Sequence, residues 1–180
     1  MAPDLAQRYR DEGWWTDETL GETVARGLAA KRDVAFRAHS AVRPWDGDFG
    51  AVADRAQALA GWLAARGVGP GSVVVMQLPN WVEAGITFWA ATHLGAVVVP
   101  VVHFYGPKEV RYIVDAVEPD VVVAPARFGA TDHLAVYGEL LAGRPDTTWL
   151  VVGDDPPPAG AIAFDDALVG PPLAEPLPVD

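Results

Sequence analysis

The sequence predicts an α/β protein in which helices cover both faces of a doubly wound, mostly parallel sheet. Three observations lead to this fold class. Short runs rich in valine recur along the chain, as expected for strands that are covered on both faces. Segments with apolar residues at helical spacing alternate with these runs, and the connections between them are short. Strands that alternate with helices in this way form parallel sheets with right-handed crossovers.

The first elements lie before the sheet. TDETLGETVARGLAAK, residues 16–31, predicts a helix, and VAFRAHS, residues 34–40, predicts a short strand that leads to a hairpin near residues 44–48. Asp48 suits the N-cap of a second helix, because the apolar positions of FGAVADRAQALAGWLAARG follow the helical spacing.

The glycine-rich stretch GVGPGS, residues 67–72, ends that second helix. A phosphate-binding loop runs from a strand into the N-terminus of a helix, where free N–H groups face the anion. Here the order is helix, glycines and strand, and the spacing does not match G-x-G-x-x-G. We therefore interpret Gly67 as a left-handed C-terminal cap, with Pro70 just beyond it.

Strands and helices then alternate. The predicted strands cover residues 72–78, 96–102, 120–125 and 147–153, and the predicted helices cover about 81–94, 107–117 and 131–142. The apolar stretch 81–102 approaches the length that spans a bilayer, but it contains Glu83, His93 and Pro100. A buried helix followed by a buried strand explains it better than a membrane span.

Residues 154–180 differ in composition, with seven prolines in 27 residues. FDDAL suits a short helical turn, and the rest predicts an extended linker. The sequence therefore predicts an α/β subdomain over residues 1–153 and a proline-rich linker over residues 154–180, which we expect to lead into a further part of a longer polypeptide.

The composition argues against several classes of function. Thirteen Lys and Arg stand against 24 Asp and Glu, giving a net charge of −11, which argues against a nucleic-acid partner. The lack of cysteine excludes disulfides and thiolate metal sites. The polar start MAPDLAQRYRDEGWW does not resemble a signal peptide, so we expect a cytoplasmic protein.

Common catalytic motifs do not occur in the sequence. It contains no HExxH, Walker A or G-x-S-x-G pattern, and its histidines are scattered. His93 lies on a mostly apolar helix and is interpreted as a core histidine with a partner rather than a base. We expect no catalytic residue and no metal site in this chain.

The loop VVHFYGPKEV, residues 101–110, is the main candidate site. It follows the carboxyl end of a strand, where open α/β sheets bind their ligands, and it combines a histidine, two aromatic residues, a glycine and a helix start. The alternative is an ordinary connection in which Phe104 and Tyr105 pack on neighbouring residues. The residues alone leave both interpretations open.

A longer stretch resembles a known family. GVGPGSVVVMQLPNWVEAGITFWAATHLGAVVVPVVHFYGPKEVRYIVDAVEPDVVVAP resembles the N-terminal domain of the adenylate-forming, or AMP-binding, superfamily, which includes acyl-CoA synthetases and aryl-acid adenylating enzymes. RYRDEGWWTDETLGE is similar to the start of the aryl-acid adenylating enzymes and related CoA ligases. The resemblance covers about residues 7–153, with DFGAVADRA in place of the family's usual TYxEL.

The resemblance implies an ATP-dependent ligase that activates a carboxylic acid as an acyl-adenylate and transfers it to CoA, with ATP, Mg²⁺ and CoA as cofactors. The family's phosphate loop, aromatic-Gly-x-Thr-Glu motif, ribose-binding Asp and C-terminal Lys do not occur in this chain. We therefore expect an N-terminal fragment that is inactive alone and binds no cofactor tightly. Its partners would be the acid substrate, the rest of the same polypeptide and, through exposed apolar surface, a second copy. The alternative is a stand-alone binding or interaction module derived from the family.

The resemblance also implies roles for individual residues. By their position in the family, Phe104, Tyr105 and Gly106 would line the CoA channel. Arg127 would lie near a phosphate of CoA, or would instead pair with Asp132 or face solvent. His103 would contact the acyl pocket or the channel. The sequence does not indicate which acid is activated, or whether CoA or a carrier protein is the acceptor.

Overall fold

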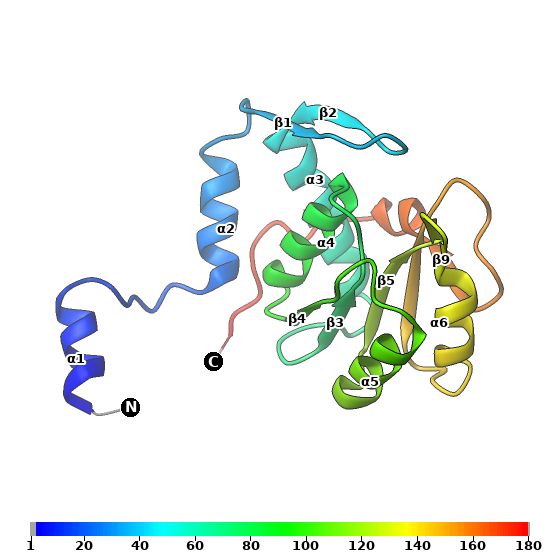
Figure 1. The fold of residues 1–180 in the computed structure, drawn as a ribbon. Coiled ribbons are helices and arrows are strands. Elements are labelled where there is room, and N and C mark those ends of the chain that lie inside the picture. Colours follow the sequence, from blue (N-terminus) through cyan, green and yellow to red (C-terminus); the bar gives the residue numbers. More distant parts are fainter. Residues whose placement is uncertain (1–2, 180) are drawn as a thin grey trace.

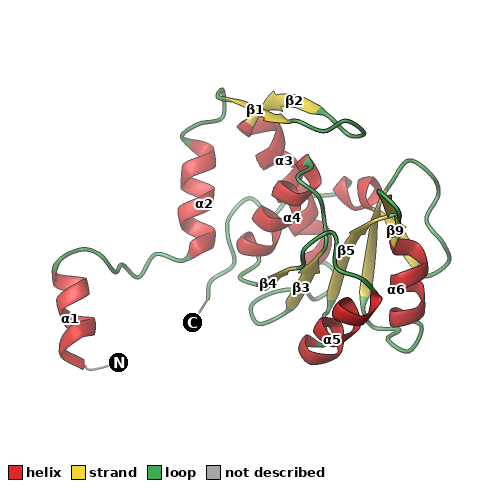
Figure 2. Cartoon of the chain, viewed as in Figure 1, coloured by secondary structure: helices red, strands yellow, loops and turns green. Residues whose placement is uncertain are grey.

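The computed structural model describes residues 3–179 and contains a doubly wound α/β sheet (Figures 1 and 2). Five parallel strands lie in the order β4-β3-β5-β8-β9. They are β3 (Val73–Met76), β4 (Val97–Pro100), β5 (Val121–Pro125), β8 (Thr148–Val152) and β9 (Ala161–Ala163). The predicted fold class is confirmed.

Helices cover both faces of this sheet. One face packs against α3 (Phe49–Ala64) and α4 (Val82–His93), and the other packs against α5 (Pro107–Val117) and α6 (His133–Leu141). Successive side chains of a strand point to opposite faces, so Val74 joins the first cluster and Val75 the second. Because both faces are covered, the strands are continuous valine runs rather than alternating patterns.

Helix α3 begins and ends as the sequence predicts. Asp48 Oδ1 accepts a hydrogen bond from Ala51 N at 2.7 Å, which satisfies one of the free N–H groups of the first turn. At the other end Gly67 has a φ of 86°, and Val68 N donates to Leu63 O at 3.2 Å. This is the Schellman arrangement. The glycine-rich stretch therefore caps a helix.

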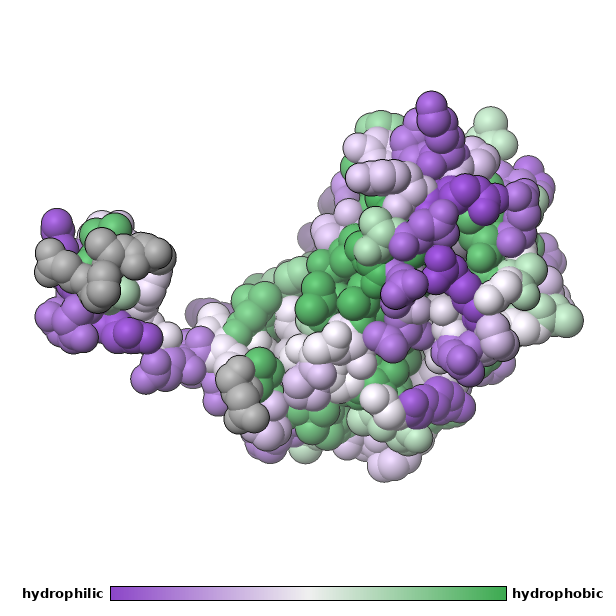
Figure 3. All heavy atoms as spheres, turned by 90° about the horizontal axis from the view of Figure 1, so that it is seen from below, coloured by the Kyte–Doolittle hydropathy of each residue, from purple (hydrophilic) through white to green (hydrophobic). Residues whose placement is uncertain are grey.

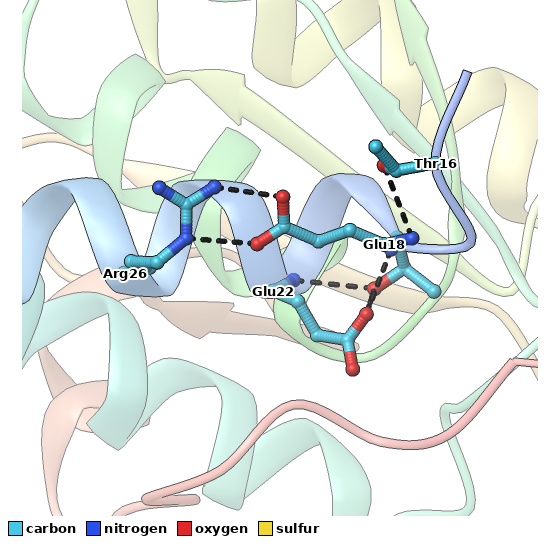
Figure 4. A network of polar contacts seen from close by, with 5 residues as sticks. Thr16, Glu18, Glu22 and Arg26 are labelled. Carbon is cyan, nitrogen blue, oxygen red and sulfur yellow. Dashed lines mark hydrogen bonds and ion pairs between the residues drawn. The ribbon is translucent and has the colours of Figure 1, made fainter. Parts of the chain in front are cut away.

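Helix α2 (Leu20–Ala29) begins with a capping box (Figure 4). Glu22 N donates to Thr19 Oγ1 at 3.2 Å, and Thr19 N donates to Glu22 Oε2 at 2.7 Å. Each residue thus satisfies a backbone N–H of the other. An ion pair between Arg26 Nη2 and Glu18 Oε2, 2.7 Å apart, links the body of the helix to the segment before it.

Two hairpins lie outside the main sheet. The predicted hairpin near residues 44–48 is present, with β1 (Ala35–Ala38) antiparallel to β2 (Trp45–Asp48). A second hairpin joins β6 (Arg127–Phe128) to β7 (Thr131–Asp132). The sequence does not predict it, because strands of two residues leave no periodic pattern.

Helix α1 (Pro3–Asp11), which we did not predict from the sequence, lies apart from the body at the end of an extended segment (Figure 1). The ring of Tyr9, on this helix, stacks on Trp14 at 6.1 Å between centroids and meets Trp15 edge-on at 5.3 Å. Seen from below, this arm is a separate lobe, and an apolar band crosses the face of the body beside it (Figure 3).

The apolar stretch 81–102 divides into α4 and β4, as the sequence predicts. Gly95 separates the two elements and has a φ of 66°, a conformation that favours glycine. Within residues 3–179, no helix is long and apolar enough to cross a membrane.

The proline-rich segment after residue 153 packs onto the body. The prediction of an extended linker is wrong at residues 161–163, because these residues form β9 and pair with β8. FDDAL forms the 3₁₀ helix η1 (Phe164–Leu168), in agreement with the predicted helical turn. Phe164 and Ala167 are buried, which holds η1 against the sheet. The domain boundary at residue 153 stays a prediction.

Residues 169–179, which we call the C-terminal strap, run over α3 and α4. Leu173 N donates to Gln57 O at 3.0 Å, and Leu177 N donates to His93 O at 2.8 Å. His93 Nε2 lies 2.9 Å from Leu173 O. The interpretation of His93 as a core histidine with a partner is therefore confirmed.

Candidate functional site

The strand order singles out the carboxyl edge of the sheet between β3 and β5. The chain leaves β3 for α4 on one face, and it leaves β5 for α6 on the opposite face. In open α/β sheets such a reversal opens a crevice in which ligands bind. Residues from the loops after β3, β4 and β5 contact one another at this edge, and we call the space between them the crevice.

The loop after β4 carries the side chains that the sequence selects. Phe104 is exposed over 72% of its surface and Tyr105 over 37%. His103 is half-buried and meets Phe104 edge-on at 5.3 Å and Phe128 edge-on at 5.0 Å. Gly106 is the N-cap of α5. The structure therefore brings His103 to the crevice and leaves Phe104 facing solvent.

Gln77, at the end of β3, supports this loop from the interior. It is fully buried, and its Nε2 donates to Val102 O at 3.0 Å and to Tyr105 O at 3.2 Å. Its Oε1 accepts from the hydroxyl of Tyr137 at 2.9 Å. Burial raises the pKa of Tyr137, so this hydroxyl keeps its proton and remains a donor.

Arg127 pairs with Asp132 across the β6–β7 hairpin, with Nη2 2.7 Å from Oδ2. This is one of the alternatives that the sequence leaves open. Both side chains are exposed, and an exposed pair contributes at most about 1 kcal/mol. Arg127 can therefore exchange Asp132 for another anion at a small cost in free energy, and its role at a phosphate stays a prediction.

Arg43, in the connection between β1 and β2, lies on the other side of the crevice. Its Nε donates to Glu83 Oε1 at 2.6 Å and its Nη1 to Asp154 Oδ1 at 2.9 Å. The guanidinium also lies 5.8 Å from the ring centre of Trp81. Burial disfavours the charge of Arg43, but Glu83 and Asp154 together outweigh this effect and raise the pKa of Arg43. Arg43, Trp81, Asp154 and Arg127 line a cavity of about 210 Å³.

The sequence does not single out Arg43, Gln77 or Tyr137 as site residues. Two residues that make these contacts nonetheless stand out in the sequence. Gln77 is the one amide in the valine-rich run SVVVMQL, and Glu83 is a carboxylate in an apolar helix. Buried polar groups require hydrogen-bond partners, so both residues indicate a distant partner without identifying it.

His133, the first residue of α6, is a further polar group buried at this edge. It is only 1% exposed, and neither ring nitrogen has a hydrogen-bond partner. Burial lowers the pKa of His133; Asp132 opposes this effect, and His103 adds to it. His133 is therefore neutral at pH 7 and adds no charge to the crevice.

Within residues 3–179, no group of three or more His, Cys, Asp or Glu side chains is placed to hold a metal ion. The groups that do converge are aromatic rings from three loops and two guanidinium groups, each with a carboxylate partner. Aromatic surface beside cations suits the binding of a ligand that has both a planar part and an anionic part.

Comparison with known proteins identifies the family. A sequence profile described as AMP-binding enzyme matches residues 37–176, which include every residue of the crevice described above. This chain belongs to the AMP-binding enzyme family. The resemblance found in the sequence is therefore confirmed.

The alignments with individual relatives include most of this chain. The salicylyl-CoA synthase / salicylate adenylyltransferase of a Streptomyces species is 29% identical over 177 residues, or 96% of this chain and 30% of that protein. The medium-chain fatty-acid–CoA ligase of Escherichia coli K12 is 27% identical over 154 residues, or 84% of this chain and 26% of that protein. The structure of acetoacetyl-CoA synthetase from Streptomyces lividans has the same fold, with a TM-score of 0.75 at 22% identity over 89% of this chain and 26% of that one. The chain thus spans less than a third of the length of these relatives.

Proposed function

We propose that this chain forms the N-terminal part of an ATP-dependent ligase that joins a carboxylic acid to CoA through an acyl-adenylate. The crevice with its exposed aromatic loop carries the proposal, because it lies where α/β sheets bind ligands and belongs to a chain of the AMP-binding enzyme family. Relatives named as CoA synthases and CoA ligases support the acceptor. The partners are the acid and the rest of a longer polypeptide.

In this proposal the loop after β4 contributes to the CoA channel. Phe104 and Tyr105 offer aromatic surface to adenine or pantetheine, and Gly106, without a side chain, lets a ligand approach the backbone. Arg127 leaves Asp132 and meets a phosphate of CoA through charge-assisted hydrogen bonds. His103 contacts the channel or the acyl pocket from its position against Phe128.

The proposed reaction also uses ATP and Mg²⁺. The carboxylate of the acid attacks the α-phosphate of ATP and releases pyrophosphate, and the thiol of CoA then displaces AMP to give a thioester. When bound, Mg²⁺ would offset the charge of the phosphates. The described residues offer no cluster of acidic ligands for it, so we assign neither metal binding nor the adenylation step to residues of this chain.

The direct test uses the protein purified from its natural source, with its mass measured first. Pyrophosphate exchange into ATP is then measured with salicylate and with octanoate, followed by thioester formation with CoA. Exchange that depends on the acid, followed by thioester formation, supports the proposal. Exchange without a thioester would indicate a carrier protein as acceptor and overturn the CoA assignment. A native mass equal to that of this chain, with no exchange, would indicate a stand-alone interaction module.

Paired variants test the channel residues in the active protein. We expect Phe104→Ala and Arg127→Ala each to raise KM for CoA about tenfold while pyrophosphate exchange stays unchanged, because a charge-assisted hydrogen bond or a buried aromatic contact contributes about 1.5 kcal/mol. Tyr112→Ala, at a 76% exposed aromatic residue on α5, and Arg111→Ala, at another exposed and paired arginine, are the matched controls. Equal effects in the controls would contradict the assignment.

A further inference from the structure

We propose that Gln77, with Tyr137 behind it, is a positioning residue that clamps both ends of the turn in the loop after β4. The part of this inference that concerns CoA rests on the proposed function. The clamp itself is a property of this chain and is tested separately.

The turn is closed by a hydrogen bond from Tyr105 N to Val102 O at 3.0 Å. The Nε2 of Gln77 donates to the carbonyl oxygens of the same two residues, at 3.0 Å for Val102 and 3.2 Å for Tyr105. A single amide group therefore holds the two carbonyls that bracket His103 and Phe104. Both N–H groups of this amide are used.

The orientation of the amide follows from its partners. Two backbone carbonyls can only accept hydrogen bonds, so they require the NH₂ end of Gln77. The hydroxyl of Tyr137 donates to the oxygen end at 2.9 Å. A flipped amide would place its oxygen against both carbonyl oxygens and would leave Tyr105 O without this donor, whereas Val102 O would keep the hydrogen bond from Tyr105 N. Tyr137 thus acts on the loop through its hydrogen bond to Gln77.

The sheet holds the backbone on both sides of the clamp in place. Gln77 N donates to Val123 O of β5 at 2.9 Å, and Val101 N donates to Met76 O at 2.8 Å. The backbone on each side of the clamp therefore belongs to the hydrogen-bond pattern of the sheet. Gln77 and Tyr137 are both fully buried, and buried networks with all partners present hold a single arrangement.

The clamp matters because the side chain of Phe104 does little to hold the turn, although His103 packs against Phe128. Phe104 is 72% exposed and therefore has little packing to fix its position. Its place beside the crevice depends on the backbone that Gln77 holds. A ligand that binds to Phe104 and Tyr105 would meet a preorganised surface, which lowers the ordering cost of binding. We therefore expect the clamp to affect the binding of CoA and to leave the adenylation step unaffected.

The first experiment measures amide hydrogen exchange at Tyr105 in this chain for Tyr137→Phe and Gln77→Leu. Tyr137→Phe removes one oxygen and tests the clamp even where Gln77→Leu fails to fold. We expect exchange at Tyr105 to be about tenfold faster in Tyr137→Phe and faster still in Gln77→Leu. Thr147→Val is the matched control, because it removes a hydroxyl bond to Pro119 O of 2.9 Å at the opposite edge of the sheet.

An unchanged exchange rate at Tyr105 in the clamp variants would overturn the inference, as would an equal acceleration in Thr147→Val. The second experiment uses the active ligase. We expect Tyr137→Phe to raise KM for CoA by about threefold to tenfold and to leave acid-dependent pyrophosphate exchange at the wild-type rate. Parallel loss of both reactions would refute the link to CoA. A wild-type protein without any CoA-dependent reaction would refute the proposed function. Amide hydrogen exchange at Tyr105 would still show whether Gln77 and Tyr137 hold the turn.

Discussion

At Gly61 on α3, the backbone of the C-terminal strap lies directly against the helix. A Cβ atom at this position would overlap the carbonyl oxygen of Pro171 and would lie 3.0 Å from Leu173 N. Both are backbone atoms, which cannot move aside by rotating a side chain. We therefore expect Gly61→Ala to lift the strap from α3.

The magnitude follows from the contacts that the strap would lose. Four hydrogen bonds hold it here: Leu173 N to Gln57 O at 3.0 Å, Gln57 Nε2 to Ala174 O at 3.3 Å, His93 Nε2 to Leu173 O at 2.9 Å, and Leu177 N to His93 O at 2.8 Å. At about 1 kcal/mol each, their loss costs up to about 4 kcal/mol. Alanine in place of glycine inside a helix contributes about 1 kcal/mol in the opposite direction. The loss of the strap contacts outweighs the gain in helix propensity, so Gly61→Ala lowers the free energy of unfolding by up to about 3 kcal/mol.

Urea unfolding followed by tryptophan fluorescence measures this change, and amide exchange at Leu173 and Leu177 reports whether the strap has left. Gly85→Ala on α4 is the matched control, because a Cβ there meets nothing within 4 Å. We expect the control to raise the free energy of unfolding by about 0.5–1 kcal/mol. The reasoning is refuted if Gly61→Ala stabilises the protein as Gly85→Ala does and both strap amides remain protected.

Buried charge leads to two more predictions. Arg43→Met should lower the free energy of unfolding by about 2–4 kcal/mol, because it leaves the buried carboxylate of Glu83 unpaired. The double variant with Glu83→Gln should recover most of this loss. If urea unfolding instead shows that the effects of the two substitutions on the free energy of unfolding simply add, the two residues are not coupled and the prediction is wrong. Stability should also fall as the pH drops below about 6.5, because burial lowers the pKa of His93 and His133 and the unfolded chain then binds more protons than the folded one. The free energy of unfolding should change by at most about 1.4 kcal/mol per pH unit for each histidine, and His133→Leu should make this dependence on pH shallower. Identical dependence on pH in the wild type and in His133→Leu would contradict this explanation.

The regular elements were predictable because their signals are local. Helix α5 has the predicted bounds 107–117, since Pro107 suits the first turn and the apolar stripe ends at Val117. Gly67 marks the end of α3 for a similar reason. Strand β9 carries no such signal. It has three residues within a proline-rich segment, and it is a strand because the open edge of β8 pairs with it.

The site was predictable only in part. The loop after β4 could be selected because it follows a strand and contains His103 and two aromatic residues. Its support could not, because Gln77 and Tyr137 are 60 positions apart in the sequence, and the contact between Arg43 and Glu83 spans 40 positions. Such pairs form when the crossover connections bring distant segments together, so a local sequence pattern does not predict them.

The course of the C-terminal strap also offers an experimental handle. Val179 lies against Gly95, beside Pro70, at the edge where β3 and β4 begin, whereas Phe104 lies past the end of β4. The chain contains no cysteine, so Val179→Cys introduces a unique thiol. A dye or surface linker attached there is separated from the aromatic loop by the length of the sheet. Protein immobilised through this thiol would present the crevice to solution for single-molecule or surface-binding measurements.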